Sequence, residues 1–115
     1  MKKLLALFSI LLLAGGVFAA PLKVVTTTPD LADLARQVGG DRVKVDSLSR
    51  GSQDPHFVEA KPSLIVKVRD ADLFVQTGLD LEIGWAPLLI QGARNARVQS
   101  GAKGFFDASD FIQPL

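Results

Sequence analysis

The sequence predicts an α/β fold in which a parallel sheet is flanked by helices. Two observations predict it. Short runs of apolar and β-branched residues alternate along the chain with longer segments of helical periodicity. Glycine and proline residues separate the two kinds of segment. Strand–helix–strand units of this kind normally place their strands parallel. The chain has no cysteine, so we expect its core to be held by apolar packing without disulfides.

The first residues are typical of an export signal. Two lysines precede an apolar stretch over residues 4–13, and small residues follow it. The stretch is shorter than the roughly 20 residues that span a bilayer. We therefore expect a signal peptide over residues 1–19, cleaved near Ala19, and a mature chain of residues 20–115. No cysteine follows the apolar run to carry a lipid, so we expect no membrane anchor in the mature chain.

The charge balance of the expected mature chain argues against a nucleic-acid partner. The full sequence has 13 basic and 12 acidic residues. Loss of Lys2 and Lys3 leaves 11 basic residues against 12 acidic ones, a net charge of −1. The remaining Lys and Arg residues form no cluster that would follow a phosphate backbone.

The first strand–helix–strand unit has the clearest pattern. The run 23–28 is rich in β-branched residues and predicts a strand. Thr28 suits the N-cap and Pro29 the first turn of a helix, which the glycines at 39–40 end. An alternating segment over 43–48 predicts the second strand. We expect one apolar face of the helix from four residues at helical spacing: Leu31, Leu34, Ala35 and Val38.

A polar loop over residues 47–59 leads to a second helix that begins at 61–63. The short apolar run 72–76 predicts the third strand, with a turn over 77–80 at its carboxyl end. We expect four residues of the second helix to face the core: Leu64, Ile65, Val68 and Ala71.

The last part of the chain is less regular. The segment 85–91 predicts a third helix, with Pro87 in its first turn. The segment 96–99 predicts a fourth strand, and residues 101–115 are mixed, with one short helical turn at 108–112. Since the carboxyl ends of parallel strands share an edge, the loops after the first three strands should open together.

The polar loop carries His56, the only histidine of the chain. Imidazole is a common ligand for zinc and manganese, and it can titrate near neutral pH. Pro55 lacks a backbone donor and biases Asp54 toward an extended conformation, which stiffens the loop. One imidazole cannot hold a metal ion tightly, because zinc normally takes several protein ligands. From these residues alone, a histidine that is structural or merely exposed, and binds no metal, remains an alternative.

An enzyme is a second alternative, with His56 as a general base and Asp54 as the group that orients it. The candidate nucleophiles are all local, and no serine, histidine and aspartate stand at the separated positions of a catalytic triad. We therefore expect no enzymatic activity. The candidates are Ser47, Ser49 and Ser52.

Several short motifs, taken in order over residues 24–82, give a more specific hypothesis. The strand and helix that open the chain are followed by Gly39-Gly40-Asp41-Arg42-Val43, by Asp54-Pro55-His56 with Glu59 and Pro62-Ser63, by Ala71-Asp72-Leu73, by Gly78-Leu79-Asp80-Leu81-Glu82 and by Trp85. In this order they resemble the amino-terminal lobe of the substrate-binding proteins of bacterial zinc and manganese ABC transporters, the periplasmic metal-binding proteins of cluster A-I.

The resemblance implies roles for the loop residues. The family's first metal-ligating histidine falls on His56, which would bind as the neutral ring while an acceptor holds its other nitrogen. Gly78 is expected to be a turn glycine, and Trp85 an aromatic of either the core or the lobe face. Three residues would support the loop without being ligands: Asp54, Pro55 and Glu59.

The resemblance also implies a function. The protein would be the periplasmic, monomeric substrate-binding component of an importer for divalent metal ions. The ion, Zn²⁺ or Mn²⁺ with zinc favoured, would be a transported ligand and not a catalytic cofactor, and the partner would be a membrane permease. An adhesin-like or other metal-independent exported binding module is the alternative.

Members of this family have two lobes, each Rossmann-like, and hold the ion between them with four side chains. The chain given ends at Leu115, and no second histidine follows His56. We therefore expect residues 20–115 to be an incomplete amino-terminal lobe without its second lobe, from a fragment or a truncated protein. Such a chain should bind metal weakly by itself.

Overall fold

The computed structural model describes residues 16 and 18–115. The expected signal peptide falls largely on residues 1–15 and 17, outside the described residues. Within the part of the chain that is described, no helix has the length and apolar character needed to cross a membrane.

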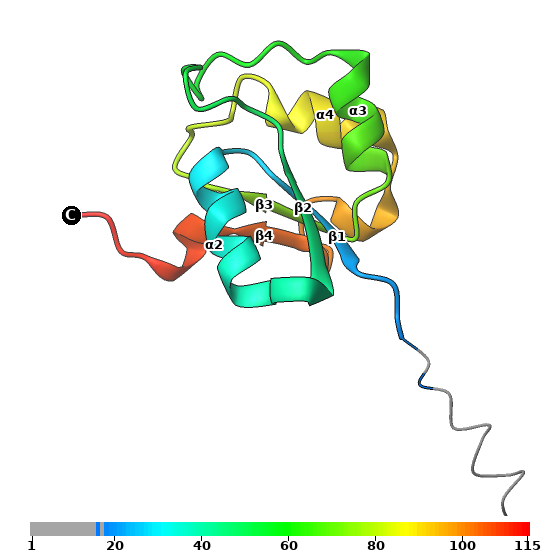
Figure 1. The fold of residues 1–115 in the computed structure, drawn as a ribbon. Coiled ribbons are helices and arrows are strands. Elements are labelled where there is room, and N and C mark those ends of the chain that lie inside the picture. The colour runs from blue at the N-terminus through cyan, green and yellow to red at the C-terminus, as the bar shows by residue number, and fades with distance from the viewer. Residues whose placement is uncertain (1–15, 17) are drawn as a thin grey trace, which may run out of the picture.

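A sheet of four parallel strands forms the centre of the molecule, in the order β2-β1-β3-β4 (Figure 1). The central strand β1 (Leu22–Thr26) pairs with β2 (Val43–Ser47) on one side and with β3 (Leu73–Gln76) on the other. The edge strand β4 (Phe105–Asp107) pairs with β3. The predicted α/β class with a parallel sheet is confirmed.

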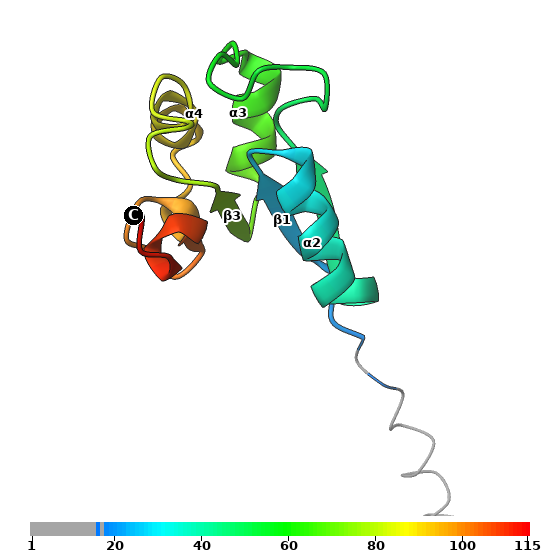
Figure 2. The same cartoon turned by 90° about the vertical axis from the view of Figure 1, so that its left-hand side faces the viewer.

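Helices cover both faces of this sheet (Figures 1 and 2). Helix α2 (Pro29–Gly39) lies over β1 and β2, whereas α3 (Pro62–Arg69) and α4 (Ala86–Ala93) lie side by side on the other face. As predicted, Pro29 opens α2 and Pro87 lies in the first turn of α4. Three short 3₁₀ helices complete the fold: η1 (Gly40–Arg42), η2 (Ala96–Val98) and η3 (Ala108–Phe111).

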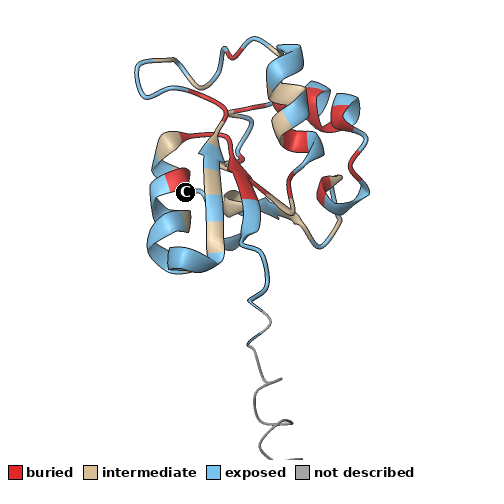
Figure 3. Cartoon of the chain, turned by 45° about the vertical axis from the view of Figure 1, so that its right-hand side comes forward, coloured by how far each residue is buried: buried red, intermediate tan, exposed pale blue. Residues whose placement is uncertain are grey.

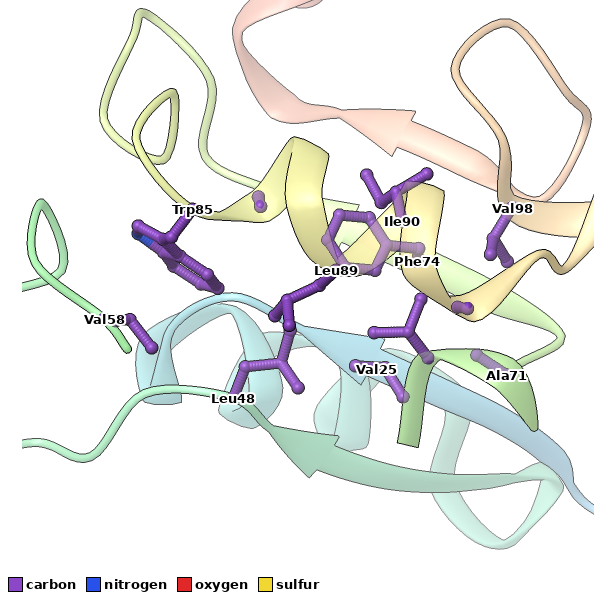
Figure 4. Packing of buried hydrophobic residues seen from close by; sticks show 12 residues of the cluster. Val25, Leu48, Val58, Ala71, Phe74, Trp85, Leu89, Ile90 and Val98 are labelled. Atoms are coloured by element: carbon purple, nitrogen blue, oxygen red, sulfur yellow. The ribbon is translucent and has the colours of Figure 1, made fainter. Parts of the chain in front are cut away.

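The hydrophobic core lies between the sheet and the α3–α4 pair. Figure 3 shows buried residues concentrated in this layer, and Figure 4 shows how they pack. The rings of Phe74 and Phe105 stack with their centroids 5.9 Å apart. The predicted core face of α3 is confirmed, because Val68 and Ala71 are buried and Leu64 and Ile65 pack against the cluster. Other large residues of the core cluster include Val25, Trp85, Leu89, Ile90 and Val98.

The predicted apolar face of α2 is wrong for two of its four residues, since Leu31 and Ala35 are half-buried but Leu34 and Val38 are exposed. Ala32 is the buried residue of this helix, whereas Leu34 is 57% and Val38 is 90% exposed. A side chain at Gly39 would collide with Val43, so the helix approaches β2 through small residues. The N-cap was predicted correctly, because the Thr28 hydroxyl accepts a hydrogen bond from the backbone N–H of Leu31.

The predicted fourth strand at residues 96–99 is also wrong. This segment forms η2, because the Asn95 side chain caps it by accepting from the backbone N–H of Arg97 at 3.1 Å. The same side chain donates to the carbonyls of Val68 and Ala71 at the end of α3. The fourth strand is β4, in the segment predicted as mixed. The helical turn predicted at 108–112 is confirmed as η3.

Candidate metal-binding site

The loops after β1, β2 and β3 open at one edge of the sheet, as predicted. The side chain of Glu82 joins two of them. Its Oε1 accepts hydrogen bonds from the Thr27 hydroxyl at 2.6 Å and from the Thr77 backbone N–H at 2.7 Å, and its Oε2 accepts from the Gly78 N–H at 3.1 Å. Glu82 is only 2% exposed. These bonds to a buried carboxylate fix the ends of β1 and β3 relative to each other.

The turn after β3 requires glycine at Gly78. Its φ of +85° lies in the left-handed region, and a Cβ at this position would collide with the side chains of Asp107 and Ser109. The next residues, Leu79 and Asp80, also have positive φ, at 52° and 65°. The prediction of a turn glycine is confirmed, and the turn is tight enough for Asp107 to pack directly against its backbone.

Asp107 lies at the carboxyl end of β4 and accepts hydrogen bonds from neighbouring side chains. Gln76 donates to its Oδ2 at 2.7 Å, and the Ser109 hydroxyl and backbone N–H donate to its Oδ1 at 2.6 and 2.9 Å. Partial burial alone would raise the pKa of Asp107. The hydrogen bonds from Ser109 and Gln76 outweigh that effect and hold the pKa below its ordinary value.

His56 lies on the loop between β2 and α3, and 59% of its side chain is exposed. Its Nδ1 lies 2.8 Å from Oδ1 of Asp54, and its backbone N–H donates to the same oxygen at 2.9 Å. The backbone hydrogen bond and the ring contact of His56 both lower the pKa of Asp54, so this carboxyl stays ionised. A neutral ring would then carry its proton on Nδ1, which leaves Nε2 as the nitrogen free to bind an ion.

The loop is attached to the core through the residue before the histidine. The indole Nε1 of Trp85 donates a hydrogen bond of 2.8 Å to the carbonyl oxygen of Pro55. Trp85 is 2% exposed and belongs to the core cluster, so of the two predicted locations the core is correct. Its indole nitrogen nevertheless reaches the candidate site.

Glu59 lies apart from the histidine. Its carboxylate pairs with Lys61 at 3.3 Å, and its backbone carbonyl accepts from the Lys61 N–H at 2.8 Å. It therefore contacts the start of α3, whereas Asp54 contacts His56. Among the residues that the structure describes, no group of three His, Cys, Asp or Glu side chains is placed to hold a metal ion.

The serines considered as nucleophiles have other surroundings. The Ser47 hydroxyl donates to the carbonyl of Ser49 at 2.8 Å. The Ser49 hydroxyl is buried and has no hydrogen-bond partner among residues 16 and 18–115. A hollow of about 630 Å³ between the loop and α3 is lined by both polar and apolar residues; Ser47 and Ser52 are among them, and His56 is not. The contacts therefore give no support to a serine–histidine pair.

Sequence reasoning missed the roles of Glu82 and Trp85 in shaping this edge. Both residues stood in the motifs that carried the resemblance, but each acts on residues distant in the chain. Glu82 contacts Thr27, 55 residues away, and Trp85 contacts Pro55, 30 residues away. The available signals were an acidic residue four positions after a turn glycine and the only tryptophan of the chain.

Comparison with known proteins gives a consistent picture. The chain is 36% identical over 97 residues to the manganese ABC transporter substrate-binding lipoprotein PsaA of Streptococcus pneumoniae, a match that covers 82% of this chain and 30% of that protein. It is 33% identical, with the same coverage, to the iron ABC transporter substrate-binding lipoprotein MtsA of Streptococcus pyogenes serotype M1. The chain thus spans about 30% of the length of these curated relatives.

A solved structure agrees with these relatives. A crystal structure of ZnuA matches with a TM-score of 0.67 and 27% sequence identity, over 83% of this chain and 34% of that one. The family model described as "Zinc-uptake complex component A periplasmic" (ZnuA) matches residues 24–114. That match covers the sheet, its helices and the His56 loop, and the chain therefore belongs to the ZnuA family.

Proposed function

We propose that this protein is the amino-terminal lobe of an exported substrate-binding component, which captures a divalent metal ion and delivers it to the membrane permease of an ABC importer. The names of its relatives support the transport role, since they are metal ABC transporter substrate-binding proteins. The observation that carries the proposal for this chain is the Asp54–His56 contact, because it prepares one imidazole nitrogen to bind a metal ion.

In this proposal His56 is a metal ligand through Nε2. Asp54 accepts from Nδ1–H, so it fixes the tautomer and the direction of the ring and raises the basicity of the opposite nitrogen. The carboxylate is a support and not a ligand. Pro55 fixes the backbone between the two, and Glu59 holds the start of α3 through Lys61. The metal ion is cargo, and the site has no catalytic role.

Zinc is the proposed ion, with manganese as the nearest competitor. A neutral imidazole suits zinc, whereas additional carboxylate ligands shift the preference toward manganese. The relatives are named for manganese, iron and zinc, so the choice depends on the ligands that complete the site. One imidazole supplies a single ligand, and we propose that the others come from parts of a longer protein.

The proposed setting is the periplasm, with a signal peptide over residues 1–19 cleaved near Ala19 and residues 20–115 forming the lobe. The relatives are named as periplasmic proteins or lipoproteins, which supports a location outside the cytoplasm. We propose that the lobe is monomeric and that the permease is its macromolecular partner.

Zinc titration of the mature chain tests the ligand assignment. We expect weak binding that His56→Ala abolishes and that Asp54→Asn weakens by about tenfold, since partners of metal-ligating histidines typically contribute this much. Glu59→Gln is the matched control, because it removes a loop carboxylate that does not contact His56. Undiminished zinc affinity in His56→Ala would refute the assignment.

A further inference from the structure

We propose that Trp85 is a positioning residue for the ion-binding nitrogen of His56. This inference rests on the proposed function, in which His56 takes up the ion. The indole N–H of Trp85 donates to the carbonyl of Pro55, the residue immediately before the histidine. The bond joins the start of α4 to the loop after β2, so it connects the core directly to the proposed ligand.

The loop is held at its two ends, where Leu48 and Val58 are buried in the core, and the segment between them carries His56. Residues 50–57 are all exposed or half-buried. Their other hydrogen bonds run within the segment, and two of them, Gln53 to Phe57 and Arg50 to Gln53, are long at 3.4 Å. Among the described residues, the bond from Trp85 is the one hydrogen bond that joins this segment to another element.

Trp85 itself is held firmly. Its ring is buried in the core, and Figure 4 shows it at the start of α4, close to Val58 of the loop. Its backbone N–H donates to the carbonyl of Glu82 at 3.1 Å, and the Glu82 carboxylate is fixed by the ends of β1 and β3. A donor fixed in this way holds the Pro55 carbonyl in one place, and the backbone of His56 with it.

The positioning role differs from a purely apolar role in a measurable way. Phenylalanine at position 85 would keep much of the buried apolar ring but could not donate a hydrogen bond. If Trp85 only fills the core, removal of its N–H should affect the loop no more than an equally destabilising core substitution elsewhere. If it positions His56, the loop should loosen and the ion should bind less tightly.

Two changes at position 85 distinguish the positioning role of Trp85 from a purely apolar role. One is Trp85→Phe. The other replaces the residue with its benzothiophene analogue, which keeps the bicyclic shape and substitutes sulfur for N–H. The analogue acts at one site because the chain has a single tryptophan. Val98→Ala is the control, because Val98 is fully buried in the same cluster and is remote in sequence from residues 50–57.

Two readouts are taken on each folded protein. The first is the hydrogen-exchange rate of the His56 backbone amide without metal. The second is Zn²⁺ affinity, followed by NMR of the His56 ring. We expect both changes at position 85 to speed exchange and to weaken zinc binding by about tenfold, whereas Val98→Ala leaves both unchanged at a similar loss of thermal stability.

The outcomes separate the two proposals. Unchanged exchange and affinity in the analogue protein would overturn the positioning role. Equal losses in Val98→Ala would overturn it too, since they would indicate a general loosening of the fold. If the His56 ring of the wild type does not respond to zinc, the proposed function fails. The positioning role is still tested in that case, because it is refuted if the changes at position 85 leave amide exchange at His56 unchanged.

Discussion

Two parts of the same sheet edge are built differently. The ends of β1 and β3 meet at the buried carboxylate of Glu82, which accepts three hydrogen bonds. Residues 50–57 of the loop after β2 are exposed or half-buried, and among the described residues the hydrogen bond from Trp85 to Pro55 is the one that joins them to another element. The two parts have different roles. Glu82 and its partners Thr27, Thr77 and Gly78, called the base here, are buried or half-buried, and the more exposed loop beside them carries His56. This comparison predicts that substitutions of Glu82 and Gly78 alter stability, whereas substitutions of His56 and Asp54 alter metal binding.

The largest expected effect is at the base. Glu82→Leu removes the acceptor shared by Thr27, Thr77 and Gly78, and it leaves the donors of the buried residues Thr27 and Gly78 without a partner. We expect it to lower the free energy of unfolding by about 3 kcal/mol or more, measured by urea denaturation. Glu59→Gln, which breaks an exposed pair with Lys61, should change it by less than about 0.5 kcal/mol. Similar losses in the two variants would contradict the distinction between base and loop.

The turn beside the base should be nearly as sensitive. Gly78→Ala places a side chain where Asp107 and Ser109 lie and imposes a left-handed backbone on alanine. We expect a loss of about 2 kcal/mol or more in thermal or urea unfolding. Gly51→Ala, on the His56 loop, has open space around the new Cβ and is the matched control. A tolerated Gly78→Ala would mean that the turn can rearrange.

A smaller effect at the same edge depends on pH. The folded-state pKa of Asp107 is depressed, so the folded state favours the ionised form. The resulting stability is fully present above the unfolded pKa, near 4, and is lost as the pH falls through the lower folded value. In urea unfolding between pH 7 and pH 2, Asp107→Asn should therefore lose less stability on acidification than the wild type. Parallel pH profiles would exclude this contribution.

The smallest effect on stability is expected on the loop. His56→Ala removes an exposed side chain that contacts Asp54, so the unfolding free energy should change by less than about 0.5 kcal/mol. Thermal unfolding without metal measures this, and the same variant should lose zinc binding. A large loss of stability would mean that His56 is a structural residue.

Elements of the fold could be predicted where neighbouring residues determine the local structure. They could not be predicted where contacts between residues distant in the chain determine it. Thr28 and Pro29 indicated the start of α2, and the β-branched run before them indicated the strand β1. The prediction of a strand at 96–99 is wrong because the side chain of Asn95 caps a 3₁₀ helix there. On α2, Leu34 and Val38 are exposed although helical periodicity assigned them to the apolar face.

In the candidate site, too, contacts between neighbouring residues could be predicted and contacts between distant residues could not. The Asp54-Pro55-His56 run was visible because its residues are neighbours, and Asp54 does contact the histidine. The contacts of Glu82 and Trp85 reach across 55 and 30 residues, and no pattern along the chain reports such pairs. Burial also could not be inferred for Glu82, because acidic side chains are usually exposed.

The state of the His56 ring is the most direct test of the account. Nitrogen NMR of the mature chain distinguishes Nδ1 from Nε2 in the neutral ring and follows both during zinc titration. We predict that Nδ1 carries the proton, held by Asp54, and that added zinc shifts the Nε2 signal while Nδ1 stays protonated. A ring protonated on Nε2, or one whose two signals ignore zinc, would contradict the account.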